Sequence, residues 1–492
     1  MTGDSSTHGG STVLDTTPMR SHTRHDRLPE RQWVGPVAGG SVVALLLATT
    51  LLLPSQADRG TALGVTAVVA VVLLGALVLA WPSSSTRGPL STAGQLVLHL
   101  TPVLLLTTVF PLVATEIGAA RIAGVSLTSV VLASSMTVPW LSQSACMPLY
   151  RGIGDTLHRP DRDAMIAAFC RAWPLIALRS LSVVALFAVP VQLVFGWPLE
   201  VLGAYLLLTV LHLLFVQLLV LTNRPDHRGL WAAAWTAYAV ALFVVPTVWV
   251  LPPLAGILVL LVPLRRHVRK LADPLRLDRR DVASDLVRGL LLGAVLWADK
   301  FVFLLVAGRD FAVDVVFLAL LPAILAYNAY FVLFAPRFDR EVGTMRSAME
   351  AEPLDRLHRY SARLAGTVSS GILKTGVVGA ALVLVVTGGV VVFDRASAPL
   401  ASAVAVASWA FMMTTVVSYK LDYVGQRWVA QAIGAAHLAA VVAAFALLPS
   451  GTTVYLALAG AELLLLGLAL RSCTRHWGRP EYSLFWRHAT SW

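Results

Sequence analysis

Long apolar stretches separated by short polar gaps run through most of this chain. Most stretches are close to the ~20 apolar residues that a helix needs to cross a bilayer. Because 251–264 is short and closely follows 230–248, the pattern predicts an all-α polytopic membrane protein with twelve to fourteen spans. The apolar segments are 34–53, 61–81, 93–114, 122–143, 173–194, 199–222, 230–248, 251–264, 287–306, 313–335, 372–394, 398–418, 427–448 and 452–470.

The positions of the basic residues predict the orientation. Of the 38 Lys and Arg residues, thirty-two lie in the two tails, in every second gap between apolar segments, or within three residues of such a gap. The other gaps hold only Arg59, Arg121, Arg309 and Arg395. Because cytoplasmic loops carry the excess of Lys and Arg, both termini are expected in the cytoplasm of a multi-pass plasma (cytoplasmic) membrane protein.

The amino-acid composition narrows the class of protein. The chain is 57% hydrophobic and 13% charged, which makes lipid the solvent for most of it. The net charge of +11 is spread over the expected cytoplasmic loops, so it indicates topology and attraction to anionic lipid, and no nucleic-acid partner is expected. Cys146, Cys170 and Cys473 form no CxxC pair. No metal, cofactor or enzymatic activity is expected, because phosphate-loop, HExxH and GxSxG motifs are missing from suitable contexts.

The most basic loop divides the last twelve spans into two sets of six. Two longer cytoplasmic segments, 144–172 and 336–371, follow the second helix of each set and predict an architectural repeat. They are interpreted either as solvated linkers or as a cytoplasmic gate or docking site for a synthase. The expected organisation is a disordered cytoplasmic tail (1–33), two additional N-terminal helices (34–81), a first six-helix lobe (93–264), a basic linker (265–286), a second lobe (287–470) and a cytoplasmic C-terminal tail (471–492).

Ionisable residues inside predicted spans mark candidate sites for ion coupling. A charge at the bilayer centre costs ~2.5–3.5 kcal/mol on insertion scales, so each needs a function or a partner. The candidates are Asp299, Lys300, Glu462, His212 and His437. Lys300 can alternatively extend to the outer interface with Asp299 neutralising it. The histidines suit proton relays, or they can be neutral, hydrogen-bonded packing residues.

Two polar and aromatic clusters beside prolines are candidates for a substrate path. The first carries Trp140 and Gln143, and the second carries Tyr327, Asn328 and Tyr330. Amide and hydroxyl groups beside aromatic rings suit a hydrated passage, or a sugar contacted by its polar edge and its apolar face. The alternative is an interfacial aromatic belt with interhelical hydrogen bonds.

Residues 93–470 resemble the PelG family of exopolysaccharide exporters, within the multidrug/oligosaccharidyl-lipid/polysaccharide flippase superfamily. Three passages carry the resemblance: WLSQSACMPLYRGIGDTLHRPD, LWADKFVFLLV and VSYKLDYVGQRW, with Asp299 and Lys300 as its most specific match. The resemblance implies two six-helix lobes around a central cavity that opens alternately to each side. It also implies a cytoplasmic glycosyltransferase and accessory membrane proteins as partners.

Together these features favour an exporter or flippase that moves a polysaccharide or lipid-linked glycan out of the cytoplasm by alternating access. Two alternatives remain open. One is an ion-coupled drug or metabolite antiporter of the same superfamily. The other is a non-transporting membrane subunit of a polysaccharide synthase complex.

Overall fold

A computed structural model describes residues 89–157, 161–222, 228–275, 277–308 and 311–489. The tail 1–33 and the predicted spans 34–53 and 61–81 lie outside the described residues. Within the described ranges the protein is almost entirely helical. The exception is a two-stranded hairpin, Arg121–Ile122 with Val125–Ser126. Its turn contains Gly124 at φ +85°, a conformation that side chains with a Cβ rarely adopt.

The first half contains six long or apolar helices. They are α3 (Pro89–Ala119), α4 (Leu127–Ile153), α5 (Arg162–Phe195), α6 (Leu199–Leu219), α7 (Arg228–Val244) and α8 (Leu251–Leu261). Two short 3₁₀ helices, Val262–Arg266 and Val268–Ala272, follow α8 and form much of the expected linker.

The second half contains α9 (Arg279–Ala307), α10 (Val313–Ala329), α11 (Ala335–Ala351), α12 (Leu354–Phe393), α13 (Ala398–Tyr423), α14 (Arg427–Leu447), α15 (Gly451–Trp477) and α16 (Pro480–Ala489). A π-helical turn, Tyr330–Phe334, joins α10 to α11 without a break in the helix.

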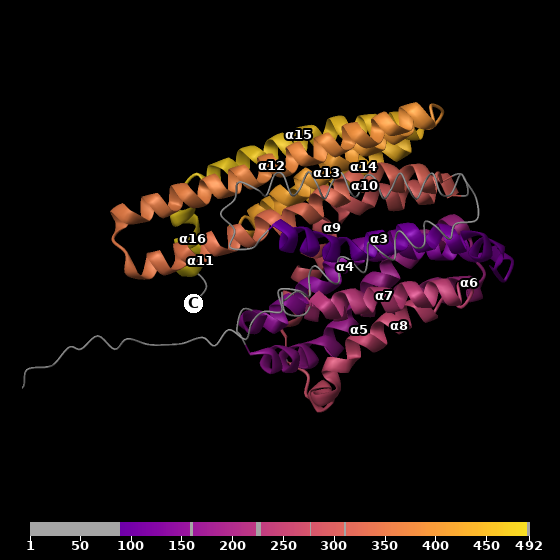
Figure 1. Cartoon of the computed structure of the whole chain (residues 1–492), viewed down its shortest axis with the longest axis horizontal. Helices are drawn as coiled ribbons and strands as arrows, with labels where there is room; N and C mark the ends of the chain where they lie inside the picture. The colour runs from indigo at the N-terminus through magenta and orange to yellow at the C-terminus, as the bar shows by residue number, and fades with distance from the viewer. Residues whose placement is uncertain (1–88, 158–160, 223–227, 276, 309–310, 490–492) are drawn as a thin grey trace, which may run out of the picture.

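Helices of the two halves gather on opposite sides of the molecule, with α3 and α9 between them (Figure 1). Helix α9 packs along α4 of the first half and along α14 of the second. The cytoplasmic extension expected over 336–371 is formed by α11 and the start of α12, onto which α16 packs.

Among the residues that the structure describes, eight helices are long and apolar enough to cross a membrane: α5, α6, α9, α10 continued by α11, α12, α13, α14 and α15. The chain is therefore a polytopic all-α membrane protein, while the count of twelve to fourteen spans stays a prediction. Helix α4 is also long enough, at about 40 Å, but Ser, Thr and Gln interrupt its apolar face. Helix α7 is a shorter apolar helix.

Several helices extend beyond the apolar segments. The segment 122–143 begins in the hairpin, and its helix runs ten residues further to Ile153, because Arg151 there is bound by carboxylates of α9. The linker 265–286 ends in helix, because Asp278 caps α9 by accepting a hydrogen bond from the Arg280 backbone N–H. The C-terminal tail from 471 is helical, since α15 continues to Trp477.

Glycines let α9 approach both of its neighbours closely. A Cβ on Gly289 would lie 2.5 Å from the Gln143 carbonyl oxygen, and one on Gly293 would lie 2.8 Å from the Trp140 carbonyl oxygen. On the other side, a Cβ on Gly434 of α14 would lie 2.4 Å from the Leu291 carbonyl oxygen. Small residues permit this backbone contact in membranes, where lipid supplies no hydrophobic drive for helix association.

Candidate functional site

Four ionisable side chains meet inside the second half of the protein. Asp299 and Lys300 come from α9, His437 from α14 and Glu462 from α15. Each is at most 1% exposed. The three helices are brought together by apolar faces and by the close approach at Gly434. These four residues are called the buried charge cluster below.

Two short contacts organise the buried charge cluster. The Lys300 Nζ lies 3.0 Å from Asp299 Oδ2, and His437 Nδ1 lies 2.7 Å from Glu462 Oε2. Lys300 also donates hydrogen bonds to the Leu296 carbonyl oxygen at 3.3 Å and to Ser408 Oγ at 3.2 Å. Neighbouring residues of α9 point about 100° apart, yet the flexible lysine stem reaches back to the adjacent carboxylate.

The charges of the cluster do not cancel when the histidine is neutral. Asp299 and Glu462 then contribute two negative charges against the one positive charge of Lys300. A single proton on His437 or Glu462 makes the cluster neutral. An uncompensated buried charge is strongly unfavourable, so one additional proton or small cation would balance the two carboxylates against the single ammonium.

Two polar atoms of the cluster, Glu462 Oε1 and His437 Nε2, have no hydrogen-bond partner among the described residues. The carboxylate of Asp299 is instead paired with Lys300 through Oδ2. The phenol of Tyr455 is close enough to Asp299 to interact with it electrostatically. Buried polar atoms are nearly always hydrogen-bonded, so these free acceptors are suited to receive a proton, water or a small cation.

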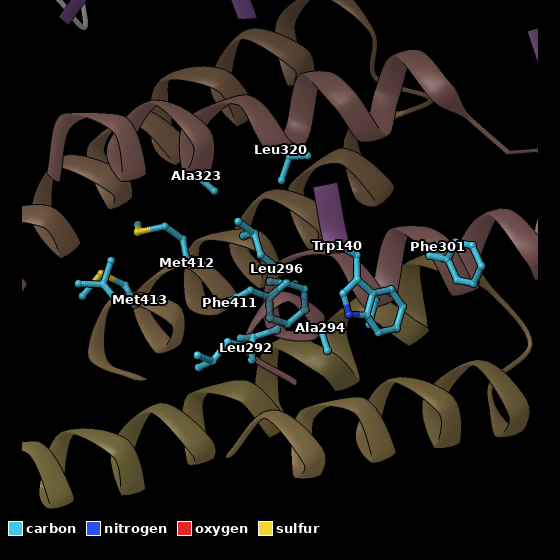
Figure 2. Close-up of a cluster of buried hydrophobic side chains, with 14 of the residues drawn as sticks. Trp140, Leu292, Ala294, Leu296, Phe301, Leu320, Ala323, Phe411, Met412 and Met413 are labelled. Atoms are coloured by element: carbon cyan, nitrogen blue, oxygen red, sulfur yellow. The ribbon is translucent and has the colours of Figure 1, made fainter. Parts of the chain in front are cut away.

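Apolar side chains of α9, α10 and α13 surround the cluster and limit its access to water. Phe411 stands between the two pairs: its ring centroid is 5.0 Å from Lys300 Nζ and 4.9 Å from the His437 ring centroid. Figure 2 shows Phe411 beside Leu292 and Leu296 of α9 in this apolar environment. The cation–π contact gives Lys300 a stabilising partner besides Asp299.

The structure does not bring the fifth candidate, His212, into the cluster. It lies on α6 in the first half, where Nδ1 is 2.9 Å from the Leu208 carbonyl oxygen and Nε2 is 2.8 Å from the Tyr238 hydroxyl. Both ring nitrogens therefore have partners, as expected of a packing residue. Its role in ion coupling stays a prediction.

A second polar group joins the two halves. The Tyr419 hydroxyl of α13 donates to Gln143 Oε1 of α4 at 2.8 Å and accepts from the Tyr327 hydroxyl of α10 at 3.4 Å. All three side chains are half-buried. The Phe331 ring, 39% exposed, packs edge-on against Tyr327 at 4.8 Å between centroids. We call Gln143, Tyr327 and Tyr419 the tyrosine bridge.

The other substrate-path candidates lie apart from the tyrosine bridge. Trp140 is buried, donates from Nε1 to the Leu290 carbonyl oxygen at 2.8 Å, and packs edge-on against Phe301. Asn328 donates to the Ile324 carbonyl oxygen of its own helix. Tyr330 is buried near Lys420, whose Nζ is 5.4 Å from its ring centroid. Their place on a substrate path stays a prediction.

Ion pairs join α4, α9 and α13 near one end of these helices. Arg151 of α4 donates to both oxygens of Asp285 on α9, with Nη2 2.9 Å from Oδ1. Arg288 lies 3.3 Å from Asp285 and 3.7 Å from Asp422 of α13. Asp285 is 1% exposed, so solvent screens its pairing with the two guanidiniums only weakly. This network holds the two halves together at the end that the charge pattern assigns to the cytoplasm.

The sequence interpretation missed Arg151, Asp285, Ser408 and Tyr419. One signal was available for Asp285: it is four residues after Asp281, so both carboxylates lie on one face of α9, and both bind Arg151. Tyr419 lies within VSYKLDYVGQRW, but its partner is 276 residues away, and no local pattern indicates that distance. Among the described residues, no group of three or more His, Cys, Asp or Glu is placed to hold a metal ion.

No protein-family profile and no curated protein matches the chain. Solved structures similar to it include an outward-facing multidrug resistance MATE family transporter of the MOP superfamily, with TM-score 0.47 and 11% identity over 78% of this chain and 94% of that one. The bent form of the Vibrio cholerae MATE transporter VcmN has TM-score 0.43 and 12% identity over 83% and 99%. The MATE transporter ClbM in complex with Rb⁺ has TM-score 0.40 and 13% identity over 87% and 94%.

Proposed function

We propose that this protein is an ion-coupled membrane exporter whose cycle depends on the buried charge cluster. The observation that carries the proposal is the meeting of Asp299, Lys300, His437 and Glu462 within apolar surroundings, with acceptor atoms left free. Ionisable residues inside a membrane are expensive and mark ion pathways and proton relays. A purely structural polytopic subunit has no need of such a cluster.

The coupling step follows from the charge balance. With one proton bound, the cluster is neutral and stable in its closed, apolar environment. Release of that proton to one side of the membrane leaves a net negative charge beside Lys300, which favours water entry or rebinding of a cation. Alternate exposure of the cluster would therefore link proton or cation movement to rearrangement of α9, α14 and α15.

The tyrosine bridge is the proposed meeting point of substrate and protein. Its amide and phenol groups, with the ring of Phe331 beside them, offer hydrogen bonds next to an apolar face. Sugars present the same combination of hydroxyl edges and apolar faces. We therefore propose that the exported molecule is a polysaccharide or a lipid-linked glycan, in line with the PelG-like passages, and that it moves when contacts between α4, α10 and α13 open.

The close contact between α4 and α9 favours a second candidate, a non-transporting membrane subunit of a polysaccharide synthase. Gly289 and Gly293 bring these helices to backbone contact, and Ser144 Oγ donates to the Leu286 carbonyl oxygen at 2.7 Å across the same interface. A subunit without a transport cycle would keep this interface closed at all times.

Asp299→Asn tests the coupling role. The variant keeps the shape of the side chain but removes the negative charge beside Lys300. Because Lys300 loses its carboxylate partner, the variant should be less stable than the wild type. It should still elute as a monodisperse species, with glycan secretion per expressed molecule lowered at least tenfold. Asp394→Asn is a matched control, because Asp394 lies in the exposed turn after α12, where its Oδ1 accepts from the Ser397 backbone N–H. Normal secretion by a well-folded Asp299→Asn variant would refute the coupling role.

A second measurement separates the exporter from the synthase subunit. In proteoliposomes, imposed proton or sodium gradients should drive substrate movement through the wild type, and proton release measured by a pH-sensitive dye should disappear in Glu462→Gln. A subunit without a cycle shows neither substrate movement nor gradient dependence. Movement of cationic drugs without glycan movement would instead identify a drug antiporter.

A further inference from the structure

The linker between the two halves carries a compact group of basic residues directly after α8. The two 3₁₀ helices that follow α8 carry four basic residues between positions 265 and 270: Arg265, Arg266, Arg269 and Lys270. All four side chains are exposed. Val268 among them is 53% exposed. We call these four basic residues the linker patch.

The carboxylates of the linker are already engaged elsewhere. Asp273 pairs with Arg171 of α5 at 3.2 Å, and Asp278 caps the start of α9. Asp281 and Asp285 both bind Arg151 of α4. The linker patch has no ion pair with any residue in the described ranges. The linker therefore presents a local excess of positive charge that its own acidic residues do not neutralise.

The patch directly follows an apolar helix. It begins four residues after Leu261, the last residue of α8, whose 11 residues are all apolar or glycine. The Leu275 backbone N–H donates to the Arg171 carbonyl oxygen at 2.8 Å, which holds the other end of the segment against α5. An exposed valine between basic residues suits an interface in which charges meet headgroups and an apolar side chain enters the acyl boundary.

We infer that the linker patch binds the headgroups of anionic phospholipids in the adjacent leaflet. Topology alone requires basic residues in this loop, but it does not require that they lack carboxylate partners or lie together within six positions. Basic clusters directly beside membrane helices are attracted to anionic lipid, with each charge contributing about a fivefold change in binding. Since the patch lies between α8 and α9, bound lipid would hold the segment through which the two halves move relative to each other.

Native mass spectrometry of the detergent-purified full chain tests this inference. The probes are dioleoylphosphatidylglycerol and dioleoylphosphatidylcholine, titrated separately. We expect the wild type to prefer phosphatidylglycerol and the preference to weaken with salt. Replacing all four patch residues by Gln should reduce the preference at least tenfold. Replacing only Arg265 and Arg266 should reduce it by an intermediate factor, which keeps the test valid if the fourfold variant does not fold.

A matched control removes the same charge elsewhere. Arg337, Arg340, Arg359 and Arg363 on α11 and α12 are exposed, and acidic residues are interspersed among them. Their replacement by Gln should change the lipid preference by less than twofold. Equal losses in both fourfold variants would show that overall charge decides the preference and would overturn the inference. An unchanged preference in the patch variants would overturn it as well. Equal competition by millimolar inorganic phosphate would reassign the patch to free phosphate.

Discussion

The backbone contact between α4 and α9 leads to a sharp prediction about Gly289→Ala. A Cβ at this position would lie 2.5 Å from both the Gln143 carbonyl oxygen and the Ser144 Cα. Ordinary contacts of this kind require about 3.5 Å, so the two helices must separate by roughly 1 Å. Two interhelical hydrogen bonds cross the same interface, from Ser144 Oγ to the Leu286 carbonyl oxygen and from Trp140 Nε1 to the Leu290 carbonyl oxygen.

The expected loss of stability combines two effects. Overpacking costs about 1–3 kcal/mol, and weakening two hydrogen bonds adds about 1 kcal/mol each. These costs sum to about 3–5 kcal/mol, and the greater helix preference of alanine offsets about 0.5–1 kcal/mol of them. Gly289→Ala should therefore lower the free energy of unfolding by about 2–4.5 kcal/mol.

Gly343→Ala on α11 is the matched control, because nothing lies within 4 Å of its Cβ position. It should be neutral or slightly stabilising. The assay is the thermal midpoint of the purified, detergent-solubilised proteins, followed by size-exclusion chromatography after heating. If Gly289→Ala melts at or above the temperature of Gly343→Ala, the helices are not in backbone contact, and the reasoning from this interface is refuted.

Three further results are expected. A cysteine replacing Arg309 should react with an impermeant thiol reagent in intact cells, and one replacing Arg340 should not; the reverse labelling would overturn the topology. Asp285→Asn should lower the free energy of unfolding by about 2–4 kcal/mol, because it removes the buried carboxylate that accepts charged hydrogen bonds from Arg151. Asp281→Asn, at a carboxylate with 56% of its side chain exposed, should cost less than about 1 kcal/mol; equal losses would contradict the difference in burial. Tyr419→Phe should lower the free energy of unfolding by about 1–2 kcal/mol, because it removes the hydrogen bond to Gln143. The thermal midpoint measures this loss, and an unchanged midpoint would mean that the contact contributes nothing to joining the halves.

Hydropathy predicted the described helices well because lipid imposes a length and a composition on every span. It also selected Asp299, Lys300, His437 and Glu462 one at a time, since each is costly in an apolar segment. What it could not predict is that these four meet. Helical periodicity places a residue on a face of its own helix, but the pairing of α14 with α15 across the His437–Glu462 contact depends on tertiary packing.

Helices extend beyond the apolar segments where polar contacts hold the extra turns. Helix α4 continues past residue 143, and Arg151 near its end is held by two aspartates of α9. The sequence could not decide whether Trp140 is a packing residue or a substrate-binding residue. The same local sequence is compatible with an Nε1 that donates to a backbone carbonyl and with one that donates to a ligand. The structure places that Nε1 on the Leu290 carbonyl oxygen.

The π-helical turn Tyr330–Phe334 absorbs one residue between α10 and α11. A π turn accommodates one more residue than the α-helical turn it replaces. Loss of one residue there would restore a regular α-helical turn and leave the helix downstream in its present phase. Phe338, whose ring centroid is 3.1 Å from Lys420 Nζ, would keep its place against α13. The same deletion in the regular helix between Ala335 and Phe338 would rotate Phe338 by about 100° and point it away from α13.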